Sequence, residues 1–176
     1  MANTKHYVIT AITLGLIGAF SALAIGLTNF VTAEKIKVNE QNKINSGIVE
    51  IFGENAKISL NKDFENEEYK YIEKVYEVSN LEDKEIGYAF RTTGSNNYGK
   101  ISLLVGFNLD SAFISLQVVT NEQTYAQTLV DNYIVPLNED VSKLDDVSCG
   151  ATYGAKLVRE MVNEAKQASL EKPWRG

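Results

Sequence analysis

One uncharged run near the N-terminus constrains this chain most. No charged side chain occurs between Tyr7 and Ala33, "YVITAITLGLIGAFSALAIGLTNFVTA". As a helix the run would rise roughly 40 Å at about 1.5 Å per residue, enough to cross a hydrocarbon core about 30 Å thick. A signal peptide cleaved after Ala33 is the alternative, but the run exceeds the roughly 7–15 apolar residues of a signal core. We therefore predict a retained anchor helix over residues 1–33.

Small residues recur on one face of this predicted helix. Gly18, Ala22 and Gly26 follow one another at intervals of four, a spacing that lets a second membrane helix approach closely. The same residues also fit the general abundance of glycine in membrane spans. A helical partner and ordinary composition both stay open as interpretations.

Charges flanking the run bear on its orientation. Lys5 precedes the run, and further lysines follow it, with Glu34 and Glu40 among them. Those lysines are Lys35, Lys37 and Lys43. Taken literally, the positive-inside rule would place the C-terminal domain in the cytoplasm.

Composition excludes several function classes. The chain has 176 residues and a net charge of −6, which argues against a nucleic-acid-binding protein because phosphates require a cationic face. Cys149 is the single cysteine, and His6, before the uncharged run, is the single histidine. The C-terminal domain therefore has no internal disulfide, no Ser–His or Cys–His nucleophile pair and no structural zinc.

Residue periodicity after the anchor changes from helical to strand-like. Residues 34–54 keep helical spacing, with isoleucines at 44, 48 and 51 on one side and Gly53 as a stop. Residues 55–68 are polar, and we predict a loop. Four alternating runs then predict strands: Ile72, Tyr76 and Val78; Ile86, Tyr88 and Phe90; Ile101, Leu103, Val105 and Phe107; Ile114, Leu116 and Val118. Short connections predict an antiparallel meander with one buried face.

Helices complete the predicted domain. The segment "NEQTYAQTLVDNYIVPL" fits a loop and a short helix that stops at Pro136. A final amphipathic helix is indicated by Ala151, Ala155, Val158, Val162 and Ala165. Strands followed by helices predict an α+β fold. Its parts are a transmembrane anchor (1–33), an amphipathic stalk (34–54), a domain with an antiparallel sheet and a C-terminal helix (55–168), and a tail (169–176).

Small residues crowd the start of the final helix. The sequence "SCGATYGAKLV" places Gly150 and Ala151 directly before Thr152. A helix N-terminus offers unpaired N–H groups and the positive end of the helix dipole, so a phosphate could bind at this backbone. Alternatively, an upstream side chain caps the helix, the candidates being Asp145, Asp146 and Ser148. On chemistry alone, the cap is the simpler interpretation.

The motif "DVSCGAT", Asp146 to Thr152, resembles the flavinylation motif of the FMN-binding domain family. That domain occurs in the G subunit of the Rnf electron-transport complex and in its longer relative from the sodium-translocating NADH:quinone reductase. Family members show Asp, two variable residues, Ser or Thr, and then Gly-Ala-Thr; here Cys149 takes the Ser/Thr place. Upstream, "NYGKISLLVGF" resembles the family's Gly-Tyr-Gly-Gly-x-Ile strand start. The resemblance covers about residues 87–165, and the short chain suits the Rnf subunit better.

A second family motif is only partly retained. The segment "VVTNEQTYAQTL" stands where the family has His-x-Glu-Thr-Pro-Gly-Leu-Gly. Thr124 is kept, whereas Gln123 replaces the acid, Tyr125 the proline, Ala126 the glycine and Gln127 the leucine. The flavin environment implied by the resemblance therefore differs in detail from that of the family.

The resemblance implies that Thr152 carries FMN through a phosphoester bond. Backbone groups of Gly150 and Ala151 would flank the phosphate, whose charge the helix N-terminus would stabilise by roughly 0.3–1 kcal/mol. The residues implied to face the flavin ring are Thr124, Tyr125 and Gln127. Tyr125 or Tyr153 would stack on the ring or, alternatively, be ordinary packing residues.

The resemblance further implies a membrane-anchored FMN electron carrier in an Rnf-type ferredoxin:NAD oxidoreductase complex, coupled to sodium or proton translocation. Its expected partners are the other subunits of the complex, membrane lipid, and a flavin transferase that uses FAD and magnesium. In relatives the flavin domain of this single-pass subunit lies on the extracytoplasmic side, against the lysine count above, and the subunit is not catalytic alone. An anchored structural, pilin-like or adhesion protein without flavin is the alternative.

Overall fold

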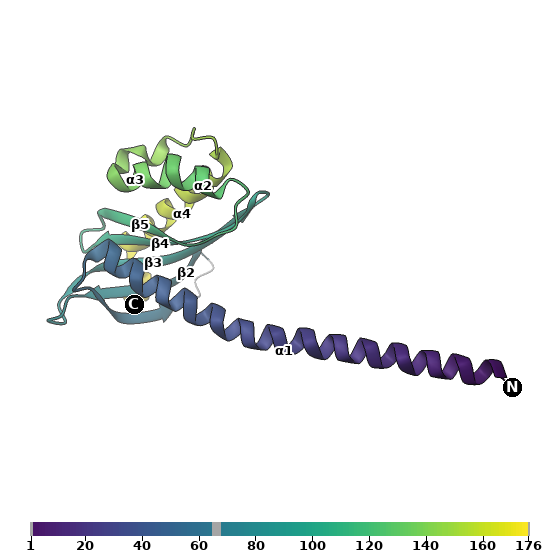
Figure 1. The fold of residues 1–176 in the computed structure, drawn as a ribbon. Coiled ribbons are helices and arrows are strands. Elements are labelled where there is room, and N and C mark those ends of the chain that lie inside the picture. Colours follow the sequence, from purple (N-terminus) through teal and green to yellow (C-terminus); the bar gives the residue numbers. More distant parts are fainter. Residues whose placement is uncertain (1, 65–67, 176) are drawn as a thin grey trace. The chain divides into compact units, whose positions relative to one another are not determined.

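The computed structural model describes residues 2–64 and 68–175. The remaining positions, which fall in the predicted anchor, loop and tail, lie outside the described residues. The chain divides into two compact units, residues up to Gln41 and residues from Asn42 onward. Helix α1 (Ala2–Phe52) contributes to both (Figure 1).

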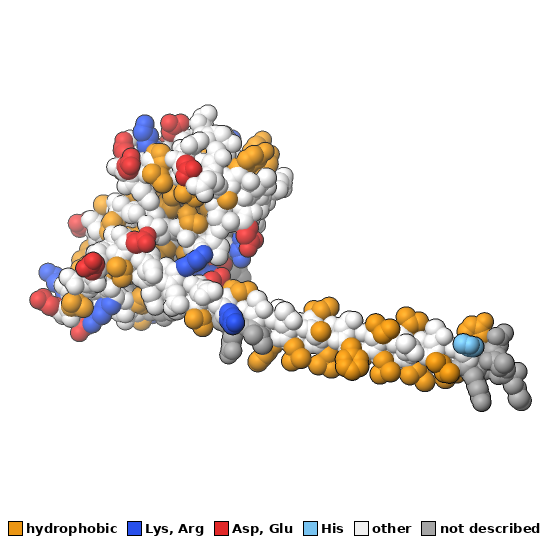
Figure 2. Space-filling view, in the orientation of Figure 1, with side chains coloured by type: hydrophobic (Ala, Val, Ile, Leu, Met, Phe, Trp, Pro, Cys, Tyr) orange, Lys and Arg blue, Asp and Glu red, His pale blue; other side chains and the backbone are white. Residues whose placement is uncertain are grey.

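The first unit is the apolar part of α1. It is the one described helix long and apolar enough to span a membrane, by length and composition, and hydrophobic side chains line it (Figure 2). Thr10, Thr13 and Thr28 donate their hydroxyl hydrogens to carbonyls four residues earlier, at 2.9, 2.9 and 2.8 Å. These polar groups are therefore satisfied within the helix, as a hydrocarbon environment requires.

A five-stranded antiparallel sheet forms the centre of the second unit. The strands are β1 (Lys57–Asp63), β2 (Ile72–Ser79), β3 (Glu85–Asn96), β4 (Gly99–Asn108) and β5 (Phe113–Asn121), in that spatial order. The α+β class, the antiparallel meander and the C-terminal helix are thus confirmed. The prediction of a loop over residues 55–68 is wrong for β1, whose polar sequence pairs along β2 at the edge of the sheet.

The prediction of a single buried face is also wrong, because the sheet is covered on both sides. Tyr88, Phe90 and Leu103 are buried on one face, and Tyr76 and Leu104 on the other. In the interior strand β4, all residues from 101 to 107 are buried. Its alternate side chains therefore enter two different cores, and neither set faces solvent.

β-Bulges decide which face each predicted side chain occupies. The pairing of β3 with β2 skips Ile86, and the pairing of β5 with β4 skips Ile114, so each isoleucine is the extra residue of a bulge. Both side chains pack on the second face. Their predicted partners Tyr88 and Leu116 lie on the first face. A bulge adds one residue and reverses the alternation, which explains why these runs do not keep to one side.

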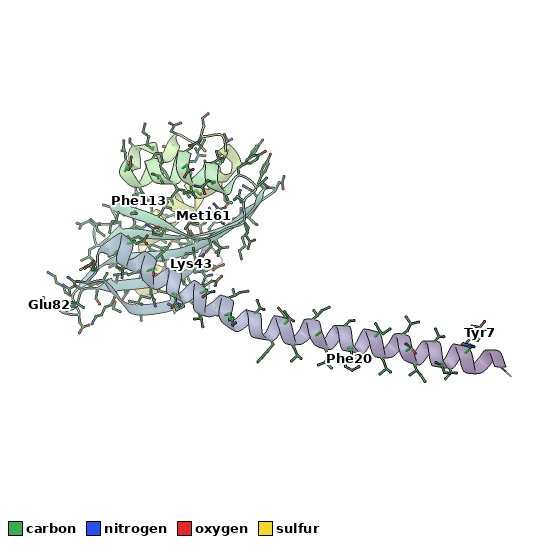
Figure 3. The ribbon with its side chains drawn as sticks, viewed as in Figure 1. Tyr7, Phe20, Lys43, Glu82, Phe113 and Met161 are labelled. Carbon is green, nitrogen blue, oxygen red and sulfur yellow. The ribbon has the colours of Figure 1, made fainter. Side chains whose placement is uncertain are left out.

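The last turns of α1 cover the second face of the sheet. Ile44, Ile48 and Ile51 are buried there. The Lys43 ammonium donates to the Val119 carbonyl at 2.9 Å, and Lys43 is labelled in Figure 3. A Cβ on Gly106 would lie 2.3 Å from Ile51 Cγ2, so only glycine lets the helix approach this closely. The end of the predicted stalk is therefore part of the sheet unit.

The opposite face carries the helices that follow β5. They are α2 (Ala126–Leu129), the π-helical turn η1 (Val130–Ile134), α3 (Val135–Glu139), the 3₁₀ turn η2 (Val141–Asp145), α4 (Thr152–Glu171) and the 3₁₀ turn η3 (Pro173–Arg175). The predicted stop at Pro136 is wrong. The proline directly follows the π-helical turn and Val135, and the helical conformation continues through it to Glu139.

Helix α4 forms the main cover of this face. Its Val158, Met161 and Ala165 are buried against the sheet, and Met161 is labelled in Figure 3. Trp174, within the segment predicted to be a tail, is also buried and lies edge-on to Tyr88 and Phe90, with ring centroids 5.4 Å apart in each pair. The residues after α4 therefore contribute to the core.

Candidate functional site

A pocket of about 230 Å³ opens at the start of α4. Four parts of the chain meet there: the β3–β4 turn, the segment after β5, helix α2, and the loop into α4. The lining residues are Tyr98, Gln123, Tyr125, Leu129, Gly150, Ala151, Thr152, Tyr153 and Gly154. The pocket thus includes the threonine that the sequence motif singles out.

Backbone hydrogen bonds fix the β3–β4 turn to the segment after β5. The Thr124 N–H and hydroxyl both donate to the Tyr98 carbonyl, at 2.8 and 3.1 Å. Gly99 has a φ of +129°, and a Cβ there would lie 2.1 Å from the Glu122 carbonyl oxygen. Glycine is therefore required at this close approach, and the tie holds Tyr98 at the rim of the pocket.

Gln123 presents one polar atom to the pocket. The side chain is 6% exposed, and its amide nitrogen donates to the Gly99 carbonyl. Its Oε1 lies 3.4 Å from the position that a Cβ on Gly154 would occupy. The oxygen therefore faces the first turn of α4.

Among the described residues, no side-chain hydrogen bond to the first N–H groups of α4 is found. Gly150 has a φ of +84°, and Ala151 is the N-cap residue, without a side-chain hydrogen bond to the helix. Asp145, one of the predicted caps, instead lies 3.8 Å from Arg159. The interpretation of this motif as a side-chain cap is wrong, and the first N–H groups of α4 have no intrahelical acceptor.

Thr152 is the first residue of α4. It is half-buried and lines the pocket. Within the described part of the chain, no hydrogen bond to its hydroxyl is found. The oxygen is thus accessible from the pocket and unused by the fold.

Three exposed tyrosines line the same pocket as Thr152. The rings of Tyr98 and Tyr153 are stacked with centroids 5.2 Å apart and planes inclined by 25°, and Tyr125 lies 6.1 Å from Tyr98. Tyr153 is 62% and Tyr125 53% exposed. The Lys156 ammonium lies 5.9 Å from the centre of the Tyr153 ring. An aromatic surface with a neighbouring positive charge is suited to a planar anionic ligand.

The predicted site residues divide into two groups. Gly150, Ala151, Thr152 and Tyr125 line the pocket. Thr124 and Gln127 do not: the Thr124 hydroxyl donates to the Tyr98 carbonyl, and the exposed Gln127 amide donates to Asp131 at 2.8 Å.

Sequence reasoning missed the lining residues Tyr98, Gln123, Leu129 and Gly154. The glycine after Tyr98, at the centre of "NNYGK", indicates a turn. No sequence signal shows that this turn lies beside the helix start, because that contact joins distant parts of the chain.

The fold and the site define a class: an α+β protein with an N-terminal helix able to span a membrane and a pocket at the start of its C-terminal helix. A scan against protein-family models finds no match for this chain, and a search among curated proteins finds none either. The function must therefore be inferred from the site and from the motif that it contains.

Proposed function

We propose that this protein is a membrane-anchored flavoprotein that carries FMN covalently on Thr152 and passes electrons within a membrane complex. The observation that carries the proposal is the unused Thr152 hydroxyl, which faces a pocket at an uncapped helix start. The resemblance of "DVSCGAT" to a flavinylation motif concerns the same oxygen. The sequence motif and the pocket geometry thus independently support Thr152 as the acceptor of FMN.

The helix start suits a phosphodiester. The N–H groups of Tyr153 and Gly154, in the first turn of α4, have no intrahelical acceptor, and the helix dipole favours negative charge there. Gly150 and Ala151 keep the approach free of large side chains. These groups would hold the phosphate while the ester bond to Thr152 fixes it in place.

The surroundings suit a flavin ring. The pocket volume of about 230 Å³ is below the roughly 300–1,000 Å³ typical of small-molecule sites. The pocket would therefore enclose only part of the cofactor, and the ring would lie against Tyr98, Tyr125 and Tyr153, whose faces are partly exposed. When bound, FMN supplies electron transfer, and the protein supplies attachment, stacking and a positive local field.

The remaining features of the proposal follow from the resemblance. The subunit would belong to an Rnf-type ferredoxin:NAD oxidoreductase coupled to sodium or proton movement, with the flavin domain on the extracytoplasmic side. A flavin transferase would load it, and other membrane subunits would exchange electrons with it. The uncharged part of α1 supports an anchored subunit.

Expression of the full chain with a flavin transferase tests the proposal. We expect a band that is fluorescent under ultraviolet light on a denaturing gel, and an intact mass increased by that of FMN less one water. Thr152→Ala should abolish both. Thr120→Ala is the matched control, because Thr120 is half-buried like Thr152 but lies in β5, outside the pocket lining, and it should load normally.

An unmodified wild-type chain beside a transferase that loads a known acceptor domain would contradict the proposal. It would favour an anchored structural or adhesion protein instead. Loading that persists in Thr152→Ala would show that another residue is the acceptor.

A further inference from the structure

Gln123 carries an acceptor that the fold leaves without a donor. We propose that its Oε1 accepts a hydrogen bond from the ribityl chain of the group bound at Thr152, so that Gln123 selects a polyol-bearing ligand. This inference rests on the proposed function and adds a specificity-determining residue to it.

The orientation of the Gln123 amide is fixed by its nitrogen. A glutamine amide has donors only on Nε2 and acceptor capacity on Oε1. Because Nε2 donates to the Gly99 carbonyl, the oxygen must point the other way. Within the described residues no donor to this oxygen is found, and it is not one of the atoms buried without a partner, so it is open to the pocket that Gln123 lines. A hydroxyl of a ligand in the pocket would supply the donor.

The position of Oε1 matches the part of FMN next to the phosphate. The oxygen lies 3.4 Å from the Cβ position of Gly154, and a side chain there would also meet Leu129 Cδ2 at 2.9 Å. Glycine at position 154 thus keeps open the space between Gln123 and the first turn of α4. Thr152 lies two residues earlier on that turn. In FMN the ribityl chain directly follows the phosphate and carries hydroxyl donors.

The experiment compares the full chain in detergent, loaded and unloaded, for the wild type, Gln123→Met and Gln167→Met. Gln167→Met is the matched control, because Gln167 is an exposed glutamine of α4 outside the pocket lining. We expect loading to raise the melting temperature of the wild type and of Gln167→Met equally. In Gln123→Met the rise should be smaller by about 2–4 °C, the effect of one lost hydrogen bond in a chain of this size.

A second measurement does not depend on variants. The unloaded wild-type chain is titrated with riboflavin and with lumiflavin, which has the ring but no ribityl chain. We expect riboflavin to bind about threefold to tenfold more tightly. Equal affinities, including no measurable binding of either compound, would overturn the assignment of Gln123 to the polyol.

The outcomes separate the two proposals. A wild-type chain that is never flavinylated removes the proposed function. A chain that is flavinylated on Thr152 but gains the same thermal stability in Gln123→Met and the wild type leaves the function intact and removes the role of Gln123.

Discussion

At the scale of single residues, Gly150 lines the pocket with a backbone conformation that favours glycine. Its φ of +84° lies in the region that disfavours side chains, and a Cβ would lie 3.3 Å from the Thr128 methyl group. We expect Gly150→Ala to lower the free energy of unfolding by about 1–2 kcal/mol from backbone strain alone and also to reduce flavin loading of Thr152. Urea unfolding and intact mass measure the two effects.

Gly53 provides the control for this substitution. It also has a positive φ, +97°, but no atom lies within 4 Å of its Cβ position. Gly53→Ala should therefore lose a similar amount of stability and load normally. Equal loading of both variants would show that the conformation of Gly150 does not matter for the modification.

The candidate site was predictable only where its residues are contiguous. Gly150, Ala151 and Thr152 follow one another in the motif, so sequence reasoning found them together. Tyr98 and Gln123 reach the pocket through hydrogen bonds between separate segments. One sequence cannot reveal such pairings, because nothing local to either residue encodes the partner.

At the scale of elements, one side chain protects the edge strand β5. The Asn138 amide accepts from the Leu116 N–H at 2.8 Å and donates to the Leu116 carbonyl at 2.9 Å. It thus occupies backbone groups that an added strand would otherwise use. We expect Asn138→Ala to cost about 1–3 kcal/mol, because the groups of a buried residue lose their partner. The measurement is the urea midpoint at unchanged m-value.

Two further variants separate this effect from the loss of any asparagine. Asn138→Asp keeps an acceptor for the N–H but turns a carboxylate oxygen toward the carbonyl, so it should be at least as destabilising. Asn132→Ala removes an exposed bond to the Cys149 carbonyl, 3.1 Å long, and should cost less. An equal loss for Asn132→Ala and Asn138→Ala would contradict the role of Asn138 at the sheet edge.

The sequence predicted the existence of most elements better than their register. Alternating runs identified β2 to β5, and the amphipathic pattern identified α4, because burial imposes those periods directly. The bulges at Ile86 and Ile114 leave no clear local mark, so the faces of those isoleucines were assigned wrongly. Strand β1 was missed because only Ile58 and Leu60 alternate in it and the rest of this edge strand is polar.

At the scale of the whole molecule, buried phenols make the stability depend on high pH. Burial raises the pKa of Tyr133 above its ordinary value, and its hydroxyl donates to the Leu144 carbonyl at 2.5 Å. Burial, followed by the hydrogen bond to Glu171, raises the pKa of Tyr69, and burial also raises that of Tyr76. Each ring is neutral in the folded protein at pH values where the unfolded chain begins to ionise.

The sign of the effect follows from proton linkage. Above about pH 10, the ordinary pKa of tyrosine, the folded state binds more protons than the unfolded state, so the free energy of unfolding falls as the pH rises. Below that value the contribution of these tyrosines is present in full. We therefore expect their part of the stability to be constant on the neutral side and to be lost progressively toward the raised pKa values of the folded state.

Urea unfolding of the full chain in detergent from about pH 8 to about pH 11 measures this loss, and tyrosinate absorbance follows the ionisation. Tyr133→Phe should be less stable at neutral pH, because the bond to Leu144 is lost, yet it should lose less stability on the alkaline side, because one linked group is gone. If the wild type and Tyr133→Phe decline in parallel, Tyr133 does not couple folding to pH. Complete ionisation of every tyrosine while the protein stays folded would contradict the linkage for all three.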